Sequence, residues 1–124
     1  MEESKNVWQL IYDELVKNGI DAYPPAIKNG ECKAPYVMFK QAGANRLGRY
    51  SSRRDFYDFY LYVPRNRYSF LSDYEAQIKQ VLDNPPLYPM IMPTGSKEND
   101  YFDDNYNAHL RILTYYNNVR DRHV

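Results

Sequence analysis

The chain has 124 residues, which is the length of one domain, and its 16 basic and 16 acidic residues leave no net charge. Zero net charge argues against a protein that coats nucleic acid by bulk electrostatics. Aromatic residues make up 16% of the chain, including 14 tyrosines, so a mean hydropathy of -0.77 does not indicate disorder. We expect residues 1–124 to form a single domain.

Residues that build disulfides and soft-metal sites are scarce. The chain has one cysteine, Cys32, which excludes an intramolecular disulfide and suits a reducing compartment. Its two histidines, His109 and His123, leave little for a metal site of nitrogen and sulfur ligands. No apolar run approaches the ~18 residues that span a membrane, and no secretion signal is visible. We expect no metal, no cofactor and no membrane association.

The first predicted element is a helix over residues 4–18. Its apolar residues recur at steps of three and four, which is typical of one buried stripe. Ser4 is placed to cap the start, and Gly19 follows where a helix often ends. Pro24 and Pro25 then favour an extended segment.

Two strands are expected next, over residues 35–40 and 56–63, because both segments are rich in aromatic and β-branched residues. Residues 41–52 between them contain two glycines and no apolar alternation, and they indicate a long hairpin loop. Alternation divides the second strand into two faces. One face carries Tyr57, Phe59, Leu61 and Val63, and the other carries Phe56, Asp58, Tyr60 and Tyr62.

A second helix is predicted over residues 69–83. Ser72 and Glu75 have the spacing of a capping box, which satisfies free backbone donors at a helix start. The apolar stripe of this helix is formed by Leu71, Tyr74, Ile78, Val81 and Leu82. We expect this stripe to pack against the Phe59 face of the preceding strand.

The remaining chain is expected to contribute two strands and a loop. Residues 87–92 are expected to form a short strand, and Pro89 within it and Pro93 after it suggest a sheet edge. Residues 94–105 are expected to form a loop. Residues 108–116 alternate as a final strand, and the polar residues 117–124 are expected to fray. The predicted class is therefore α+β, with an antiparallel sheet of about four strands and two helices packed on one face.

Candidate catalytic groups are few. The acidic loop lacks the regular ligand spacing of a calcium loop, and a solvated or partner-facing loop is the preferred interpretation. Asp55 and Asp58 lie near several arginines but do not assemble the carboxylate set of a two-metal nuclease. His109 is interpreted as a residue on a sheet face, and Cys32 has no neighbouring histidine. We expect no catalytic residue and no enzyme activity.

The clearest pattern is a charge asymmetry between the two expected loops. A neutral chain with separate basic and acidic patches is suited to head-to-tail self-association, which builds rings or filaments. The alternative is that both loops are simply solvated. The interface residues of this hypothesis are Arg46, Arg49, Arg53 and Arg54 on one side and Glu98, Asp100, Asp103 and Asp104 on the other.

Tyrosines around the arginines allow a second function, a small nucleic-acid-binding module in which aromatic rings stack on bases. Tyrosine and arginine are also enriched at protein interfaces, and zero net charge favours the interface. The tyrosines in question are Tyr50, Tyr57, Tyr60, Tyr62 and Tyr68.

The order of elements, together with the segment Pro35-Tyr36-Val37-Met38-Phe39, resembles the tail-terminator, or tail-completion, proteins of long-tailed bacteriophages and prophages. The resemblance covers roughly residues 4–118. It implies an α+β subunit without catalytic residues that forms a ring, usually a hexamer, at the head–tail junction. Such a ring terminates the tail tube, joins it to the head connector and lets DNA pass without binding it specifically. The implied location is the virion tail, after assembly in the bacterial host cytoplasm.

Overall fold

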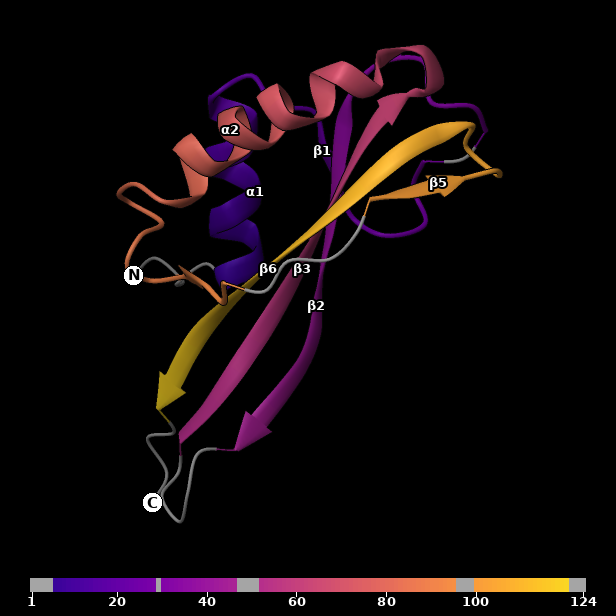
Figure 1. The fold of residues 1–124 in the computed structure, drawn as a ribbon. Coiled ribbons are helices and arrows are strands. Elements are labelled where there is room, and N and C mark those ends of the chain that lie inside the picture. Colours follow the sequence, from indigo (N-terminus) through magenta and orange to yellow (C-terminus); the bar gives the residue numbers. More distant parts are fainter. Residues whose placement is uncertain (1–5, 29, 47–51, 96–99, 121–124) are drawn as a thin grey trace.

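The computed structural model describes residues 6–28, 30–46, 52–95 and 100–120 (Figure 1). The helices are α1 (Val7–Lys17), the short 3-10 helix η1 (Arg65–Phe70) and α2 (Leu71–Leu82). The strands are β1 (Ala22–Tyr23), β2 (Tyr36–Arg46), β3 (Ser52–Pro64), β4 (Met92–Pro93), β5 (Tyr101–Asp103) and β6 (Ala108–Arg120).

The strands form one mixed sheet in the order β1-β2-β3-β6-β4, and β5 also pairs with β6. The β1–β2 pair is parallel and the other pairs are antiparallel. The predicted α+β class is confirmed. The described sheet has six strands rather than about four, because β1 and β5 are too short to show an apolar alternation.

Both helices pack on one face of this sheet, which we call the covered face. Ile11 from α1 and Ile78 from α2 share a fully buried cluster with Phe39 and Phe59 from the sheet. Trp8 stacks on Phe39 with ring centroids 4.6 Å apart, and its indole N–H donates to the Phe39 carbonyl at 3.2 Å. The predicted packing of the α2 stripe against the Phe59 face of β3 is confirmed.

The ends of α1 follow capping chemistry, although the residue that caps its start differs from the prediction. Asn6 is the N-cap, and its side chain accepts a hydrogen bond from the Gln9 backbone N–H at 2.7 Å. Ser4 lies outside the described residues. Gly19 follows the helix with a φ of 79°, a left-handed conformation that glycine adopts without strain.

Two predicted irregular segments are strands instead. Residues 41–46 continue β2 and residues 52–55 begin β3, so strands occupy the predicted long loop except for residues 47–51, which lie outside the described residues. Residues 117–120, predicted to fray, extend β6 alongside β3, and residues 121–124 lie outside the described residues. Polar residues form strands here because the neighbouring strands satisfy their backbone groups, a tertiary effect that apolar alternation does not report.

The segment between α2 and β5 also differs from the prediction. Residues 87–91 turn rather than extend, with the Ile91 N–H donating to the Leu87 carbonyl at 2.8 Å, and only Met92–Pro93 pairs as a strand. Leu87 and Ile91 are buried in the core, so their apolar character reflects packing rather than strand pairing. Part of the predicted 94–105 loop forms β5.

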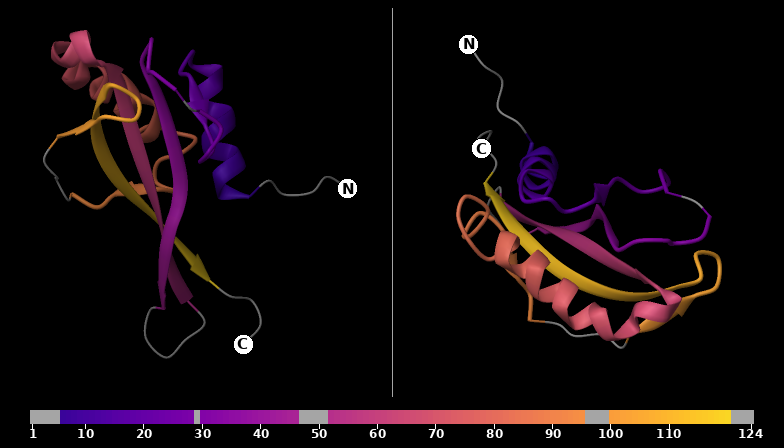
Figure 2. Two further views of the ribbon diagram at one scale, coloured as in Figure 1. Left: turned by 90° about the vertical axis from the view of Figure 1, so that its right-hand side faces the viewer. Right: turned by 90° about the horizontal axis from the view of Figure 1, so that it is seen from above.

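The opposite face of the sheet is covered only near one end. There Cys32, in the segment after β1, joins Tyr36, Tyr62 and Leu110 in a second buried cluster. Seen from above, α2 runs along one side of the sheet and the segment after β1 lies on the other (Figure 2, right). The other ends of β2, β3 and β6 project beyond both helices (Figure 1).

Candidate functional site

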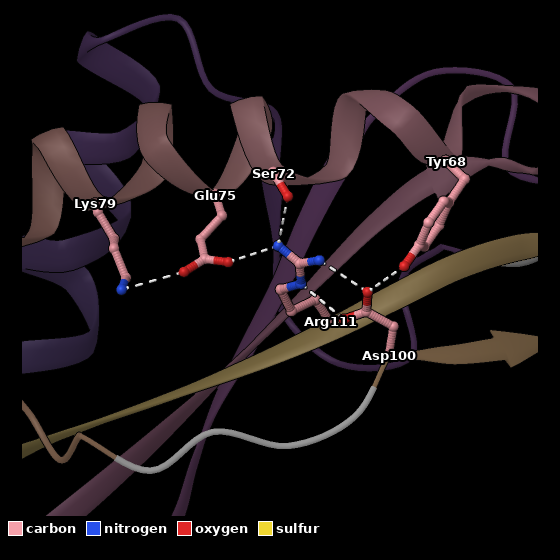
Figure 3. Close-up of polar contacts among 6 residues, drawn as sticks. All are labelled: Tyr68, Ser72, Glu75, Lys79, Asp100 and Arg111. Carbon is pink, nitrogen blue, oxygen red and sulfur yellow. Dashed lines mark hydrogen bonds and ion pairs between the residues drawn. The ribbon is translucent and has the colours of Figure 1, made fainter.

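A polar network joins α2 to the sheet around Arg111, which lies on the covered face of β6 (Figure 3). The Arg111 guanidinium donates to both carboxylate oxygens of Asp100, from Nε at 2.7 Å and from Nη2 at 2.8 Å. Its Nη1 donates to Glu75 at 2.8 Å and to the Ser72 hydroxyl at 3.2 Å. The Tyr68 hydroxyl donates to Asp100 at 2.7 Å. One arginine therefore ties β6 to α2 and to the segment before β5.

The predicted capping box is wrong, and this network explains where its residues go. The start of α2 follows η1 directly, with Phe70 at the N-cap and no side-chain cap. Ser72 and Glu75 are three residues apart, so they share one face of the helix, and that face meets Arg111. Lys79, one turn after Glu75, pairs with the same carboxylate at 3.1 Å.

The electrostatics keep this network charged at neutral pH. The Arg111 hydrogen bonds lower the pKa of the Asp100 carboxyl below its usual value. Burial acts to raise the pKa of Glu75, but hydrogen bonds from Arg111 and Lys79 outweigh it and lower the pKa. A general acid or base needs a pKa near the working pH, whereas the pKa values of Asp100 and Glu75 are both shifted further below neutral pH. The arrangement fits a structural clamp better than an acid–base pair.

A cavity of about 320 Å³ lies beside this clamp, between α2 and β6. Its lining mixes acids and bases, with Glu75 and Asp100 against Lys79 and Arg111, so it offers no single sign of charge to a ligand. Within the described ranges no three His, Cys, Asp or Glu side chains are grouped closely enough to hold a metal ion.

The predicted acidic residues lie at the clamped end of the sheet but do not act together. Asp100 is bound by Arg111, and Asp103 accepts a hydrogen bond from the Asn105 backbone N–H at 2.9 Å. Asp104 is exposed in the turn after β5, and Glu98 lies outside the described residues. The sequence pattern therefore groups Asp100, which is half-buried and ion-paired, with the half-buried Asp103 and the exposed Asp104.

This end of the sheet also carries features that the prediction missed. Tyr101 and Phe102 on β5 are exposed at 47% and 42%. The Phe102 ring meets His109 edge-on at 5.1 Å, which holds it in place. The end is not purely acidic, because η1 contributes Arg65 and Arg67.

The predicted arginines lie at the other end of the same strands. Arg46 and Arg53 are cross-strand partners, but the side chain of Arg46 and all of Arg49 lie outside the described residues. Arg53 forms an ion pair at 2.9 Å with Asp55, which is buried. Arg54, on the opposite face, lies 4.3 Å from the centre of the Tyr116 ring and donates to Asn118 at 3.0 Å.

The two charged ends are far apart within one chain. Arg53 begins β3, whereas Pro64 at the end of β3 pairs with Ala108, which in turn pairs with Asp103. Eleven residues of extended strand separate Arg53 from Pro64, which corresponds to roughly 36 Å. Arg53 and Asp103 therefore cannot pair within one copy, and a contact between copies stays a prediction.

The face of the sheet opposite the helices, from the edge of the Cys32 cluster onward, is the open face, and its Met38, Tyr60 and Ile112 pack against that cluster. Its rows follow the strand register, with Met38, Tyr60 and Ile112 in one row and Phe56 opposite Tyr116 in another. Between these rows, the Thr114 hydroxyl donates to Asp58 at 2.9 Å. The open face consists of Met38, Lys40, Arg54, Phe56, Asp58, Tyr60, Ile112, Thr114 and Tyr116.

The structure does not gather the tyrosines that suggested a nucleic-acid site. Tyr57 is buried on the covered face, and Tyr62 is buried in the Cys32 cluster. Tyr68 lies in the Arg111 network, and Tyr50 is outside the described residues. Of these five residues, Tyr60 alone is described on the open face. Its ring already has the Lys40 ammonium 5.7 Å from its centre.

Arg111 had a recognisable signal in the sequence. It shares one side of the final strand with Leu113 and Tyr115, and both of these are buried. An arginine in a core-facing position requires acidic partners, because an unpaired charge is rarely buried. Comparison with known proteins adds nothing to this, since no family model and no curated protein sequence matches the chain. No helix in the described ranges is long and apolar enough to cross a membrane.

Proposed function

We propose that this protein is a structural subunit of a phage or prophage particle that assembles head to tail into a ring at the head–tail junction. The ring terminates the tail tube and joins it to the head connector. The observation that carries the proposal is the roughly 36 Å of strand between the arginine end and the acidic end of one sheet. Unlike surfaces that meet between copies form a heterologous contact, which closes into a ring when the rotation permits.

The sheet suits the task of a rigid spacer between two contact surfaces. β3 and β6 pair along 13 residues without a break, and the helices cover one of their faces. The Arg111 clamp holds the segment before β5 against α2, so the acidic end keeps a constant position relative to the arginine end. A subunit with these properties transmits one geometry around a ring of six copies.

The proposed partners are further copies of this chain, the tail-tube subunits and the head-connector subunits. DNA crosses the lumen of the ring without specific binding. The neutral charge of the chain supports this role, because strong phosphate binding requires an excess of basic residues and would retard passage.

The solution mass of the purified chain tests self-assembly. We expect a discrete oligomer by light scattering at low salt, with ring-shaped particles by negative-stain electron microscopy. Because contacts between charged surfaces are screened at high ionic strength, the oligomer should dissociate as salt is added. A monomer at high protein concentration and low salt would contradict self-assembly.

Arg54 against Tyr116 and Lys40 near Tyr60 favour a second candidate, a module that binds single-stranded nucleic acid on the open face. Bases would have to displace these cations in order to stack on the rings, which makes this function the weaker of the two. It predicts an affinity for oligonucleotides that falls steeply with salt. Titration of a labelled oligonucleotide at two salt concentrations distinguishes it from ring formation.

A further inference from the structure

We infer that the contact between copies is made by strand β5 of one copy together with Asp104, the first residue of the turn that follows it. These residues bind to the open face of the next copy. We call residues 101–104 the tip. This inference rests on the proposed self-assembly and names its surfaces. It replaces the arginine cluster with a contact that is partly aromatic, because Arg53 is already paired with the buried Asp55.

The open face has the composition of an interface rather than of a solvated sheet surface. The outer face of an antiparallel sheet is ordinarily polar. Here Met38, Phe56, Tyr60, Ile112 and Tyr116 all lie on it, each partly exposed. Met38, Tyr60 and Ile112 also pack against the Cys32 cluster, so Phe56 and Tyr116 are the apolar residues of this face that lie beyond that cluster. Aromatic residues and methionine are enriched in the centres of protein interfaces.

The tip carries exposed aromatic side chains that are suited to anchor such a contact. Tyr101 and Phe102 are neighbours on a three-residue strand, so their side chains point to opposite sides and both remain exposed. Phe102 is steadied by His109, and the Arg111–Asp100 pair holds the chain just before the tip. Rigid aromatic side chains that project from an ordered segment are typical binding hot spots.

The charges of the tip and of the open face are complementary only when the tip of one copy meets the open face of another. The open face presents the exposed Lys40 together with Arg54, and its acid, Asp58, is already bound by Thr114. The tip carries Asp103 and the exposed Asp104. A tip on an open face therefore brings acids to cations, whereas two open faces or two tips bring like charges together.

The occupant of the open face is a second copy rather than the chain's own tip. The tip pairs with residues 108–110 at one end of β6, whereas the Phe56–Tyr116 row lies six residues further along the strand. That is roughly 20 Å of extended strand, which the three-residue β5 cannot cross. Each copy thus carries both halves of the contact and can satisfy neither alone.

Complementation between two variants tests this inference. The open-face variant combines Lys40→Glu with Phe56→Ser, and the tip variant combines Phe102→Ser with Asp104→Asn. We expect each variant alone to require at least about tenfold more protein to assemble than the wild type. An equal mixture should form a dimer, because one intact tip meets one intact open face and neither chain can continue the ring.

A matched control carries Val16→Lys on α1, where the side chain is 48% exposed and far from both surfaces. It should assemble as the wild type does. Thermal melts followed by circular dichroism establish that each variant is folded. Where a double variant does not fold, the single changes Phe56→Ser and Phe102→Ser replace it. A separate chain with both Lys40→Glu and Asp104→Lys should assemble, since the reversed charges attract.

The outcomes separate this inference from the proposed function. If the wild type is a monomer, self-assembly fails, and this inference fails with it. If the wild type forms a ring and both double variants assemble equally well, the ring stands and these surfaces are not its contact. Folded monomeric variants whose mixture does not dimerise would mean that like surfaces meet, which overturns the head-to-tail arrangement. Oligonucleotide binding lost in the open-face variant alone would assign that face to nucleic acid.

Discussion

The two faces of β3 show how one strand serves two purposes. Phe59 on the covered face is fully buried between both helices and the sheet, whereas Phe56 on the open face is partly exposed. Two arginines make the same contrast. Arg111 on the covered face is held by two carboxylates, whereas Arg54 on the open face lies on a tyrosine ring. The covered face carries the main core cluster, and the open face keeps part of its aromatic surface exposed.

The largest change in stability is expected when one phenylalanine is removed from the covered face, and the matched change on the open face tests the comparison. Phe59→Ala should cost about 3–5 kcal/mol of unfolding free energy, because it leaves a cavity in a packed core. Phe56→Ala, the matched change on the same strand, should cost only about 1 kcal/mol, as expected for a strand residue that is not fully buried. Urea unfolding of both variants, at concentrations where they are monomeric, measures the two losses. Equal losses would mean that the open face is packed as tightly as the core.

A smaller effect is expected from the Arg111 clamp. Arg111→Met should cost about 1–3 kcal/mol at pH 7, between the values for exposed and fully buried ion pairs, because Asp100 and Glu75 lose the arginine and keep only Tyr68 and Lys79, respectively. The pKa of each carboxyl is lowered in the folded chain. The free energy of unfolding that these two carboxylates contribute is therefore fully present above the pKa values they have in the unfolded chain, about 4. It is lost as the pH falls through the lower pKa values they have in the folded chain.

The difference in unfolding free energy between wild type and Arg111→Met should therefore narrow between pH 5 and pH 2. Urea unfolding at several pH values follows it. A gap that stays constant across this range would show that the arginine acts through packing of its side chain rather than through its charge.

The smallest effect is expected for the arginine of the open face. Arg54→Met should cost only about 0.5–1 kcal/mol, because a cation over an exposed tyrosine ring and a surface hydrogen bond contribute little. The same substitution at both arginines thus sharpens the comparison between faces. A loss at Arg54 as large as that at Arg111 would indicate that the open face is also needed for folding of the subunit.

Local patterns in the sequence predicted the helices and strands whose apolar side chains form the core. The three- and four-residue apolar spacing of α1 and α2 and the alternation of β3 predicted the class and the packing of α2 on β3, because those side chains are the ones that bury together in one core cluster. The ends of β2 and β6 were missed. Their residues are mostly polar or small and lack apolar alternation, and they form strands because β3 lies between them and satisfies their hydrogen bonds.

For the candidate surfaces, too, the sequence predicted one part and the tertiary structure decided the other. Sequence alone determined that basic and acidic residues gather in separate segments and that two helices cover an apolar sheet face. Only the tertiary structure decided which charges remain available. It placed Asp100 against Arg111 from β6 and Arg53 against Asp55, and it left Tyr101, Phe102 and Asp104 exposed. For Arg111 the physical reason is that its partners lie on neighbouring elements, and the distance between elements is set by packing, not by position along the chain. For Arg53 the reason is that packing buries Asp55, two residues away on the same face of β3, and a buried carboxylate needs a partner.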